Sequence, residues 1–229
     1  MTSAYASSLS LDQWQLLSPL LPCPRPTGRP RTVDLYDVVN GILYLLMSGC
    51  AWAMLPNDFP PYSTVYYYFR QWKKDGTWKQ VHDHIVEWVR VVDERAKTPS
   101  AGALDSQSVP SAVMVAQSVG YDGGKKIKGR KRFTLVDTLG LLIAVKVVAA
   151  SVPERDGAKQ LLQQVKAERE RLPRLTRIWV DGGFSGVDFL KTVIDVFGLI
   201  LEVVLRPQGS QGFVLLPRRW VVERTYGWL

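Results

Sequence analysis

The chain has 229 residues, of which 46% are hydrophobic and 22% charged, so it can bury a sizeable core. Lysine and arginine exceed aspartate and glutamate by eight, which suits a polyanionic partner such as nucleic acid, although a protein that is merely basic fits the charge equally well. The two cysteines lack metal-ligand spacing, and no apolar run reaches membrane-spanning length, which excludes a disulfide framework and an integral membrane protein. No signal peptide is visible, so we expect a cytoplasmic protein.

Residues 1–97 show helical periodicity, and we expect an all-helical, DNA-binding region there. After a helix at 9–20, the four prolines of segment 22–31 exclude regular structure. The segment is either a basic arm that lies across a DNA groove or a plain solvated linker. Its arginines, the candidate DNA contacts, are Arg25, Arg29 and Arg31.

Three more helices are predicted in this region. The first, at 33–48, is apolar nearly all round and should be buried, with Gly49 ending it. The second is capped by Ser63 and the third by Thr77, and the third carries an apolar stripe from Trp78 to Val92.

The helix predicted at 64–74 mixes aromatic and basic side chains. Such a mixture suits a recognition helix that contacts phosphates and base edges. Alternatively, the tyrosines belong to the core and the basic residues form a solvated face. The candidate DNA contacts on this helix are Arg70, Lys73 and Lys74.

From residue 98 to 229 short β-branched runs alternate with amphipathic helices, which predicts an α/β domain with a mixed sheet flanked by helices. Asp137 and Gly140 fit the first and fourth positions of a type I turn, so a hairpin is expected around them. The element order is strand, hairpin, helix, strand, helix, strand, helix. This is the order of a ribonuclease H-like fold.

Three carboxylates fall where this fold can gather them. Asp105 lies in the first strand, Asp181 directly follows a later strand and precedes two glycines, and Glu223 lies on the last helix. An all-oxygen set of this kind selects Mg²⁺ or Mn²⁺, and two such ions can carry out phosphodiester displacement. The alternatives are that Asp181 is a turn residue, that Asp105 bonds a nearby turn, and that Glu223 only pairs with Arg219.

A glycine- and lysine-rich loop is expected at 120–132. It lacks the spacing of a nucleotide-binding P-loop, so phosphate contacts along DNA are the better interpretation, and a mobile solvated loop is the alternative. Its candidate contacts are Lys125, Lys126, Lys128, Arg130, Lys131 and Arg132.

Motifs along almost the whole chain resemble those of the DDE transposases of the insertion sequence 5 group. The resemblance rests on Gln13-Trp14, Gly28-Arg-Pro-Arg31, Gly49-Cys-Ala-Trp-Ala-Met-Leu-Pro56, Leu104-Asp-Ser-Gln-Ser-Val109, the loop at 120–132, Asp156-Gly157, Asp181-Gly-Gly-Phe184 and Leu216-Pro-Arg-Arg-Trp-Val-Val-Glu-Arg-Thr225.

The resemblance implies that Asp105, Asp181 and Glu223 are the DDE triad and that Arg219 is the arginine of an Arg-x-x-x-Glu motif. It further implies two Mg²⁺ or Mn²⁺ ions and attack on DNA by water and then by a 3′-hydroxyl. The expected partners are the terminal inverted repeats, the target DNA and further copies of the chain in a dimer or higher multimer.

Two departures from the family pattern stand out. The family usually continues past the equivalent of Trp228 with a basic helical tail, and it has Lys-Thr where this chain has Pro110-Ser111.

From the resemblance as a whole, the expected function is a transposase of the nucleoid that cuts and joins insertion-sequence ends. The alternatives are a truncated copy that only binds DNA and, less well supported, a ribonuclease H-like nuclease of other purpose.

Overall fold

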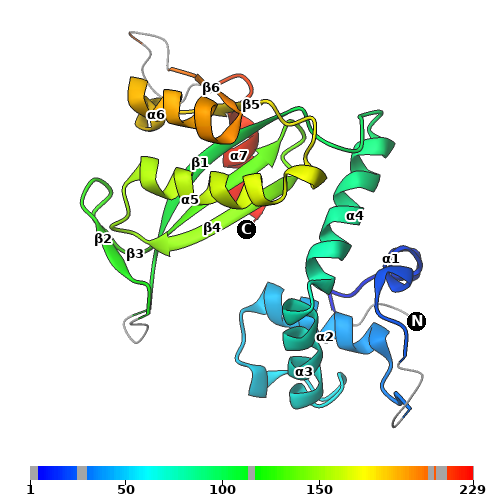
Figure 1. Cartoon of the computed structure of the whole chain (residues 1–229). Coiled ribbons are helices and arrows are strands. Elements are labelled where there is room, and N and C mark those ends of the chain that lie inside the picture. The colour runs from blue at the N-terminus through cyan, green and yellow to red at the C-terminus, as the bar shows by residue number, and fades with distance from the viewer. Residues whose placement is uncertain (1–4, 25–29, 113–116, 206–208, 210–215, 229) are drawn as a thin grey trace. The chain divides into compact units, whose positions relative to one another are not determined.

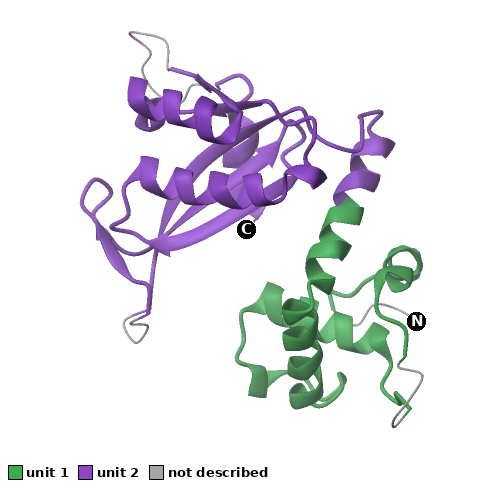
Figure 2. Ribbon diagram, viewed as in Figure 1, with its two compact units in different colours: residues 1–85 green, residues 86–229 purple. Residues whose placement is uncertain are grey.

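The computed structural model describes residues 5–24, 30–112, 117–205, 209 and 216–228. The chain divides into two compact units, residues 1–85 and 86–229 (Figure 2). The first contains helices and no described strand, and the second holds a mixed sheet with helices on its faces, as expected (Figure 1). Within the described residues no helix is long and apolar enough to cross a membrane.

The first unit packs around the buried half of its second helix. Val38, Val39 and Ile42 are fully buried there, together with Val65 and Trp72. The helices and 3₁₀ turns of this unit are α1 (Leu11–Leu17), η1 (Ser18–Leu20), α2 (Leu35–Ser48), η2 (Trp52–Met54) and α3 (Tyr62–Lys74), followed by α4 (Thr77–Val92), which continues into the second unit.

Helix α2 corrects the expectation of burial on all sides. Its last turns expose Leu46 and Met47, whereas its polar Asn40 is buried because its side-chain oxygen accepts a hydrogen bond from the backbone N–H of Leu9 at 2.8 Å. Gly49 ends the helix in the left-handed conformation, as predicted.

Two predicted helix caps are wrong. Helix α3 begins at Tyr62, one residue before Ser63, because Pro61 occupies the cap position without a side-chain bond. Helix α4 begins at Thr77 itself, so Thr77 is not its cap, and the backbone N–H and hydroxyl of Thr77 both donate to Asp75. The apolar stripe of α4 is buried only at Val81 and is exposed by Val92.

The second unit is built on a six-stranded sheet among its described residues. Its antiparallel half places β3 between β4 and β1, and its parallel half continues from β1 to β5 and β6. The strands are β1 (Ala101–Pro110), β2 (Gly120–Asp122), β3 (Ile127–Asp137), β4 (Leu142–Ala149), β5 (Arg177–Val180) and β6 (Ile200–Val203).

Helices cover both faces of this sheet. Helices α5 and α6 pack with Leu104 and Phe133 on one face, and α7 packs with Ala103 and Val136 on the other, since successive strand residues point to opposite faces. The remaining elements are α5 (Glu154–Ala167), η3 (Arg169–Arg171), η4 (Gly182–Phe184), α6 (Val187–Thr192), the π-helical η5 (Val193–Phe197) and α7 (Trp220–Trp228).

Gly157 lets α5 approach the sheet closely. A Cβ atom at this position would lie 2.0 Å from the ring of Phe133, so no larger residue fits without a shift of the helix. The glycine of the Asp156-Gly157 motif therefore has a packing role.

A buried ion pair joins the end of α4 to the β3–β4 turn within the second unit. Asp137, which is fully buried, pairs with Arg90 and also accepts hydrogen bonds from the backbone N–H groups of Leu139 and Leu141. The predicted turn is confirmed, and its aspartate has a second partner that the sequence did not reveal.

We predict that Asp137→Ala lowers the free energy of unfolding by about 3–5 kcal/mol, because it leaves the Arg90 charge buried without its partner. Urea unfolding followed by tryptophan fluorescence measures this change. The control is Asp93→Ala, which removes an exposed pair with Arg95 and should cost less than about 1 kcal/mol. Equal, small effects of both substitutions would contradict the assigned role.

Candidate active site

The sheet brings the first two predicted carboxylates together. Strands β1 and β5 are parallel, with Ala103 opposite Trp179. Because strand side chains repeat every two residues, the next position on the same face brings Asp105 level with Asp181. Asp181 also accepts a hydrogen bond of 2.8 Å from the backbone N–H of Gly183, which holds its side chain at the end of β5.

A buried arginine lies between these two carboxylates. The Nη2 atom of Arg219 is 3.8 Å from Oδ1 of Asp105 and 3.8 Å from Oδ2 of Asp181. Its side chain is only 8% exposed, and its Nε atom is buried with no hydrogen-bond partner among the described residues. The guanidinium therefore offsets the repulsion between two neighbouring negative charges.

The environment of Asp105 makes its negative charge costly. Burial raises the pKa of this carboxyl to about 6, and the nearby Asp181 charge adds to the rise, while the backbone N–H of Ser106, Arg219 and Lys125 act in the opposite direction. A further cation beside Asp105 would favour its charged form. The two adjacent carboxylates offer only oxygen ligands, which suits a hard divalent ion.

Glu223 is not in contact with this pair. It is exposed on α7, three residues before Tyr226, so Glu223 and Tyr226 share one side of this helix. The hydroxyl of Tyr226 donates to the backbone carbonyl of Asp105 at 2.9 Å, which ties this side of α7 to the carboxylates. Among the described residues, no group of three carboxylate, histidine or cysteine side chains is close enough to hold a metal ion.

Tyr226 and Gln107 are site neighbours that the sequence did not single out. The guanidinium of Arg132 lies 5.0 Å from the ring centre of Tyr226 and donates to the side-chain oxygen of Gln107 at 2.9 and 2.5 Å. Burial and the Asp105 charge raise the pKa of the Tyr226 hydroxyl, so it stays protonated and remains a donor. Arg132 is thus held by two partners, and one of them, Tyr226, also bonds the backbone of Asp105.

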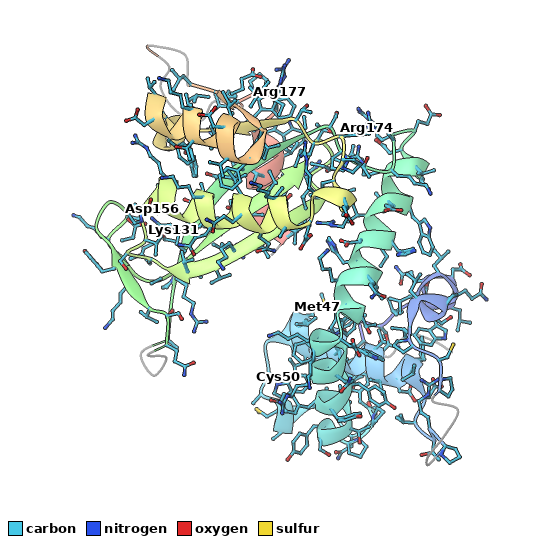
Figure 3. All side chains as sticks on the ribbon, in the orientation of Figure 1. Met47, Cys50, Lys131, Asp156, Arg174 and Arg177 are labelled. Atoms are coloured by element: carbon cyan, nitrogen blue, oxygen red, sulfur yellow. The ribbon has the colours of Figure 1, made fainter. Side chains whose placement is uncertain are left out.

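The structure corrects the prediction for Lys131. The segment expected as a loop is the hairpin of β2 and β3, and Lys131 is buried within it, beside the first turn of α5 (Figure 3). Its ammonium group lies 3.3 Å from Asp122 and 3.6 Å from Glu154, and it donates to the carbonyl of Val152. Its charge is used inside the protein, so it is not available to a phosphate.

The buried Asp122 and the partly buried Glu154 form a polar row with two serines of β1, which is not among the sequence predictions. Ser108 donates to Asp122 and Ser106 donates to Glu154, both at 2.6 Å. The Ser108 hydrogen bond, with help from Lys131, lowers the pKa of Asp122 to about 2. Serines at alternate positions of a strand were the available signal.

The other predicted basic contacts differ in accessibility. Lys125, Lys126 and Lys128 are exposed at the β2–β3 turn, and Lys125 reaches the carbonyl of Ser106 at 3.3 Å, next to Asp105. Arg130 donates to the carbonyl of Gln117. Of the basic arm, the exposed Arg31 bonds the carbonyl of Pro22, while Arg25 and Arg29 lie outside the described residues.

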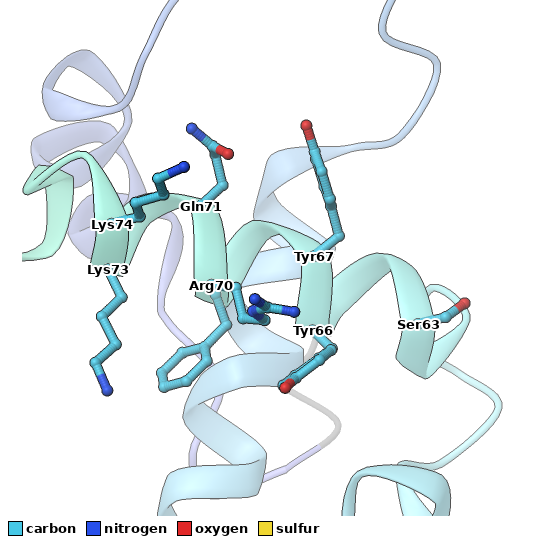
Figure 4. A pocket seen from close by; sticks show the side chains of 8 residues that line it. Ser63, Tyr66, Tyr67, Arg70, Gln71, Lys73 and Lys74 are labelled. Carbon is cyan, nitrogen blue, oxygen red and sulfur yellow. The ribbon is translucent and has the colours of Figure 1, made fainter.

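The predicted recognition helix presents its basic side chains to solvent. Arg70, Lys73 and Lys74 are exposed on α3 beside the exposed Tyr66 and Tyr67 (Figure 4). Tyr68 and Trp72 of the same helix pack in the core of the first unit, so the aromatic residues of α3 divide between the core and the exposed face, and both interpretations of its basic residues stay open.

Comparison with known proteins decides the family. A family model described as "Transposase DDE domain" matches residues 96–229, which is more than half of the chain. The chain belongs to this DDE transposase family. A second model, "Putative transposase of IS4/5 family", matches residues 9–82 of the same transposase-family chain.

One curated relative and one solved structure are similar to this transposase-family chain. The chain is 32% identical to "Insertion element IS402 uncharacterized 16.2 kDa protein" of Burkholderia cepacia over 115 residues. This alignment covers 48% of the chain and 76% of the relative. A piggyBac transposase synaptic complex with hairpin DNA aligns with 93% of this chain at 12% identity and a TM-score of 0.34, and the chain spans only 37% of that protein. A likeness of this size supports no conclusion about fold or activity.

We predict that Asp122→Asn destabilises the protein at pH 7 by roughly 1–3 kcal/mol, because Ser108 and Lys131 lose a charged acceptor. The folded pKa of about 2 lies below the ordinary value of 3.8, so this contribution is full above about pH 4 and is lost as the pH falls towards 2. Urea midpoints of wild type and variant measured across this range should converge at the acid end. A constant difference from pH 7 to pH 2 would refute the assignment.

Proposed function

We propose that this chain cuts DNA at the ends of an insertion sequence and joins the freed 3′ ends to target DNA. The observation that carries the proposal is the pair Asp105 and Asp181, level with each other at neighbouring parallel strands and both 3.8 Å from Arg219. Asp181 follows the carboxyl end of β5, where ligands of open α/β sheets gather, and Asp105 lies on the neighbouring strand β1. Membership of the DDE transposase family supports this choice.

We propose that the cofactor is a pair of Mg²⁺ or Mn²⁺ ions. Their protein ligands are Asp105, Asp181 and Glu223. When bound, such ions activate the attacking oxygen and stabilise the leaving oxygen of a phosphodiester. Glu223 lies on α7 three residues before Tyr226, whose hydroxyl bonds the backbone of Asp105, so we propose that it joins the pair when the metal ions bind.

Arg219 supplies a fixed positive charge at the place where a phosphate would meet the two aspartates. Its guanidinium cannot lose its proton, and its Nη2 atom lies 3.8 Å from both carboxylates, so its charge also attracts a phosphate bound beside them. Arg132, held over Tyr226, extends this positive edge along the sheet. The chain's own residues thus bind and orient the phosphate.

The sheet order β4-β3-β1-β5-β6 supports a ribonuclease H-like domain, which we assign to residues 98–229. Residues 1–97 form the proposed DNA-binding region, which would hold the terminal inverted repeats. We propose that the chain acts on nucleoid DNA in the cytoplasm, as a dimer or higher multimer. The basic contacts proposed are the exposed residues Arg31, Arg70, Lys73, Lys74, Lys125, Lys126 and Lys128, together with the partly buried Arg130 and Arg132, and Arg25 and Arg29 of the arm.

A second candidate function is DNA binding without cleavage. The exposure of Glu223, away from the Asp105–Asp181 pair, favours it, because a metal site with two carboxylates holds its ions less firmly than one with three. The two functions differ in one observable, the metal-dependent cutting of a DNA end.

We predict that wild type cuts a labelled duplex carrying the element's end in Mg²⁺ or Mn²⁺ and that Asp105→Asn or Asp181→Asn reduces cutting at least roughly a hundredfold. DNA binding by the variants should stay within about twofold of wild type, because phosphate contacts elsewhere supply the affinity. Asp188→Asn, an exposed acid of α6, is the matched control and should cut normally. Equal loss of cutting and binding in Asp181→Asn would overturn the assignment.

We further predict that Glu223→Gln loses cutting as severely as Asp105→Asn while its thermal stability is unchanged, because the exposed Glu223 carboxylate has no structural partner among the described residues. Cleavage assays and thermal melts of the same preparation measure the two properties. Cutting at the wild-type rate would remove Glu223 from the site, and binding without cutting by wild type would select the second function.

A further inference from the structure

Basic and aromatic side chains line the exposed face of α3 (Figure 4). The helix has 13 residues and no acidic side chain, so it is about 20 Å long, and a helix of this size fits a DNA major groove. We call this face the α3 surface. It surrounds a depression of about 790 Å³ lined by Ser63, Tyr66, Tyr67, Phe69, Arg70, Gln71, Lys73 and Lys74.

Arg70 is mounted on an aromatic platform within this surface. Its guanidinium lies 5.7 Å from the ring centre of Tyr66, one helical turn earlier. The Tyr66 ring in turn meets the edge of Trp52 at 4.9 Å, and Trp52 also contacts Phe69. Two elements, η2 and α3, therefore hold the ring beneath the arginine.

The donor groups of Arg70 remain unused within the described part of the chain. No carboxylate or carbonyl there accepts a hydrogen bond from its guanidinium, although Arg90, Arg132 and Arg171 each have such an acceptor. An arginine that is oriented by an aromatic ring and keeps its guanidinium N–H groups available can donate two parallel hydrogen bonds to an acceptor outside the protein.

Lys73 and Lys74 differ from Arg70 in this respect. Both are exposed in the last turn of α3, and no aromatic ring fixes either ammonium group in the described structure. Each is a flexible point charge, which suits a phosphate and carries no sequence information. Gln71, between them and the platform, donates to Asp75.

We propose that the α3 surface lies in a DNA major groove, where Arg70 reads a guanine edge and Lys73 and Lys74 contact the flanking phosphates. This assignment rests on the proposed function in so far as the chain binds DNA. A guanine presents two acceptors, N7 and O6, at the spacing of the arginine fork. The ring of Tyr66 positions the fork and lowers the conformational freedom lost on binding.

The test begins with duplexes selected from a random-sequence pool by the full-length wild-type protein. Dissociation constants are then measured for a selected duplex and for its scrambled version at several salt concentrations. Arg70→Lys should lose roughly ten- to a hundredfold of the preference for the selected duplex with an unchanged salt dependence, because the charge is kept and the fork is lost. Lys73→Gln and Lys74→Gln should weaken both duplexes equally and each lower the salt slope by about 0.9.

Two further variants separate positioning from folding. Tyr66→Phe keeps the ring and should retain the preference, whereas Tyr66→Leu should lose roughly two- to fivefold of it at unchanged thermal stability. Wild-type preference in Arg70→Lys, or wild-type binding without any sequence preference, would overturn the proposal. Wild type that binds no DNA would overturn the proposed function as well, while preferential binding without cutting would overturn only the cleavage function.

Discussion

Parallel pairing between β1 and β5 places Asp105 and Asp181 on adjacent strands at the same level, on the same face of the sheet. Two like charges in that position repel, and burial already raises the pKa of Asp105 to about 6. The arrangement therefore needs a cation, and Arg219 provides one at 3.8 Å from each carboxylate. The position of helix α7 depends on the same strand pair, because the hydroxyl of Tyr226 donates to the backbone carbonyl of Asp105.

Charges inside the second unit are consistently paired, which separates structural from accessible basic residues. Lys131 pairs with Asp122 and Glu154, and Arg90 pairs with Asp137, since an unpaired charge in these buried positions would be strongly unfavourable. On α3, in contrast, Arg70 and the two lysines are exposed and have no acidic neighbour on their helix. A count of basic residues treats these two groups alike, although only the second is free to meet a polyanion.

The errors of sequence interpretation share a cause. Glycine and lysine are rare in strands, so segment 120–132 is predicted to be a loop. Pairing with β1 and β4 nevertheless makes most of it a strand. Ser63 and Thr77 have the side chains of good caps, but Pro61 takes the cap position of α3, and Thr77 is the first residue of α4 and donates to Asp75. In each case an interaction with another residue, either a strand partner or a neighbour at the helix start, outweighed the local preference of the residue itself.

The sequence by itself determined the helical character of residues 1–97, the alternation of strands and helices after residue 98, the Asp137 turn and the candidates Asp105, Asp181 and Glu223. These features depend on periodicity and on turn chemistry, which act over a few residues. Only the tertiary structure decided that Arg219 lies between the two aspartates, that Glu223 is exposed, that Lys131 is buried and that Arg70 rests on Tyr66. Strand register and burial set these relations, because they join residues that no local pattern connects.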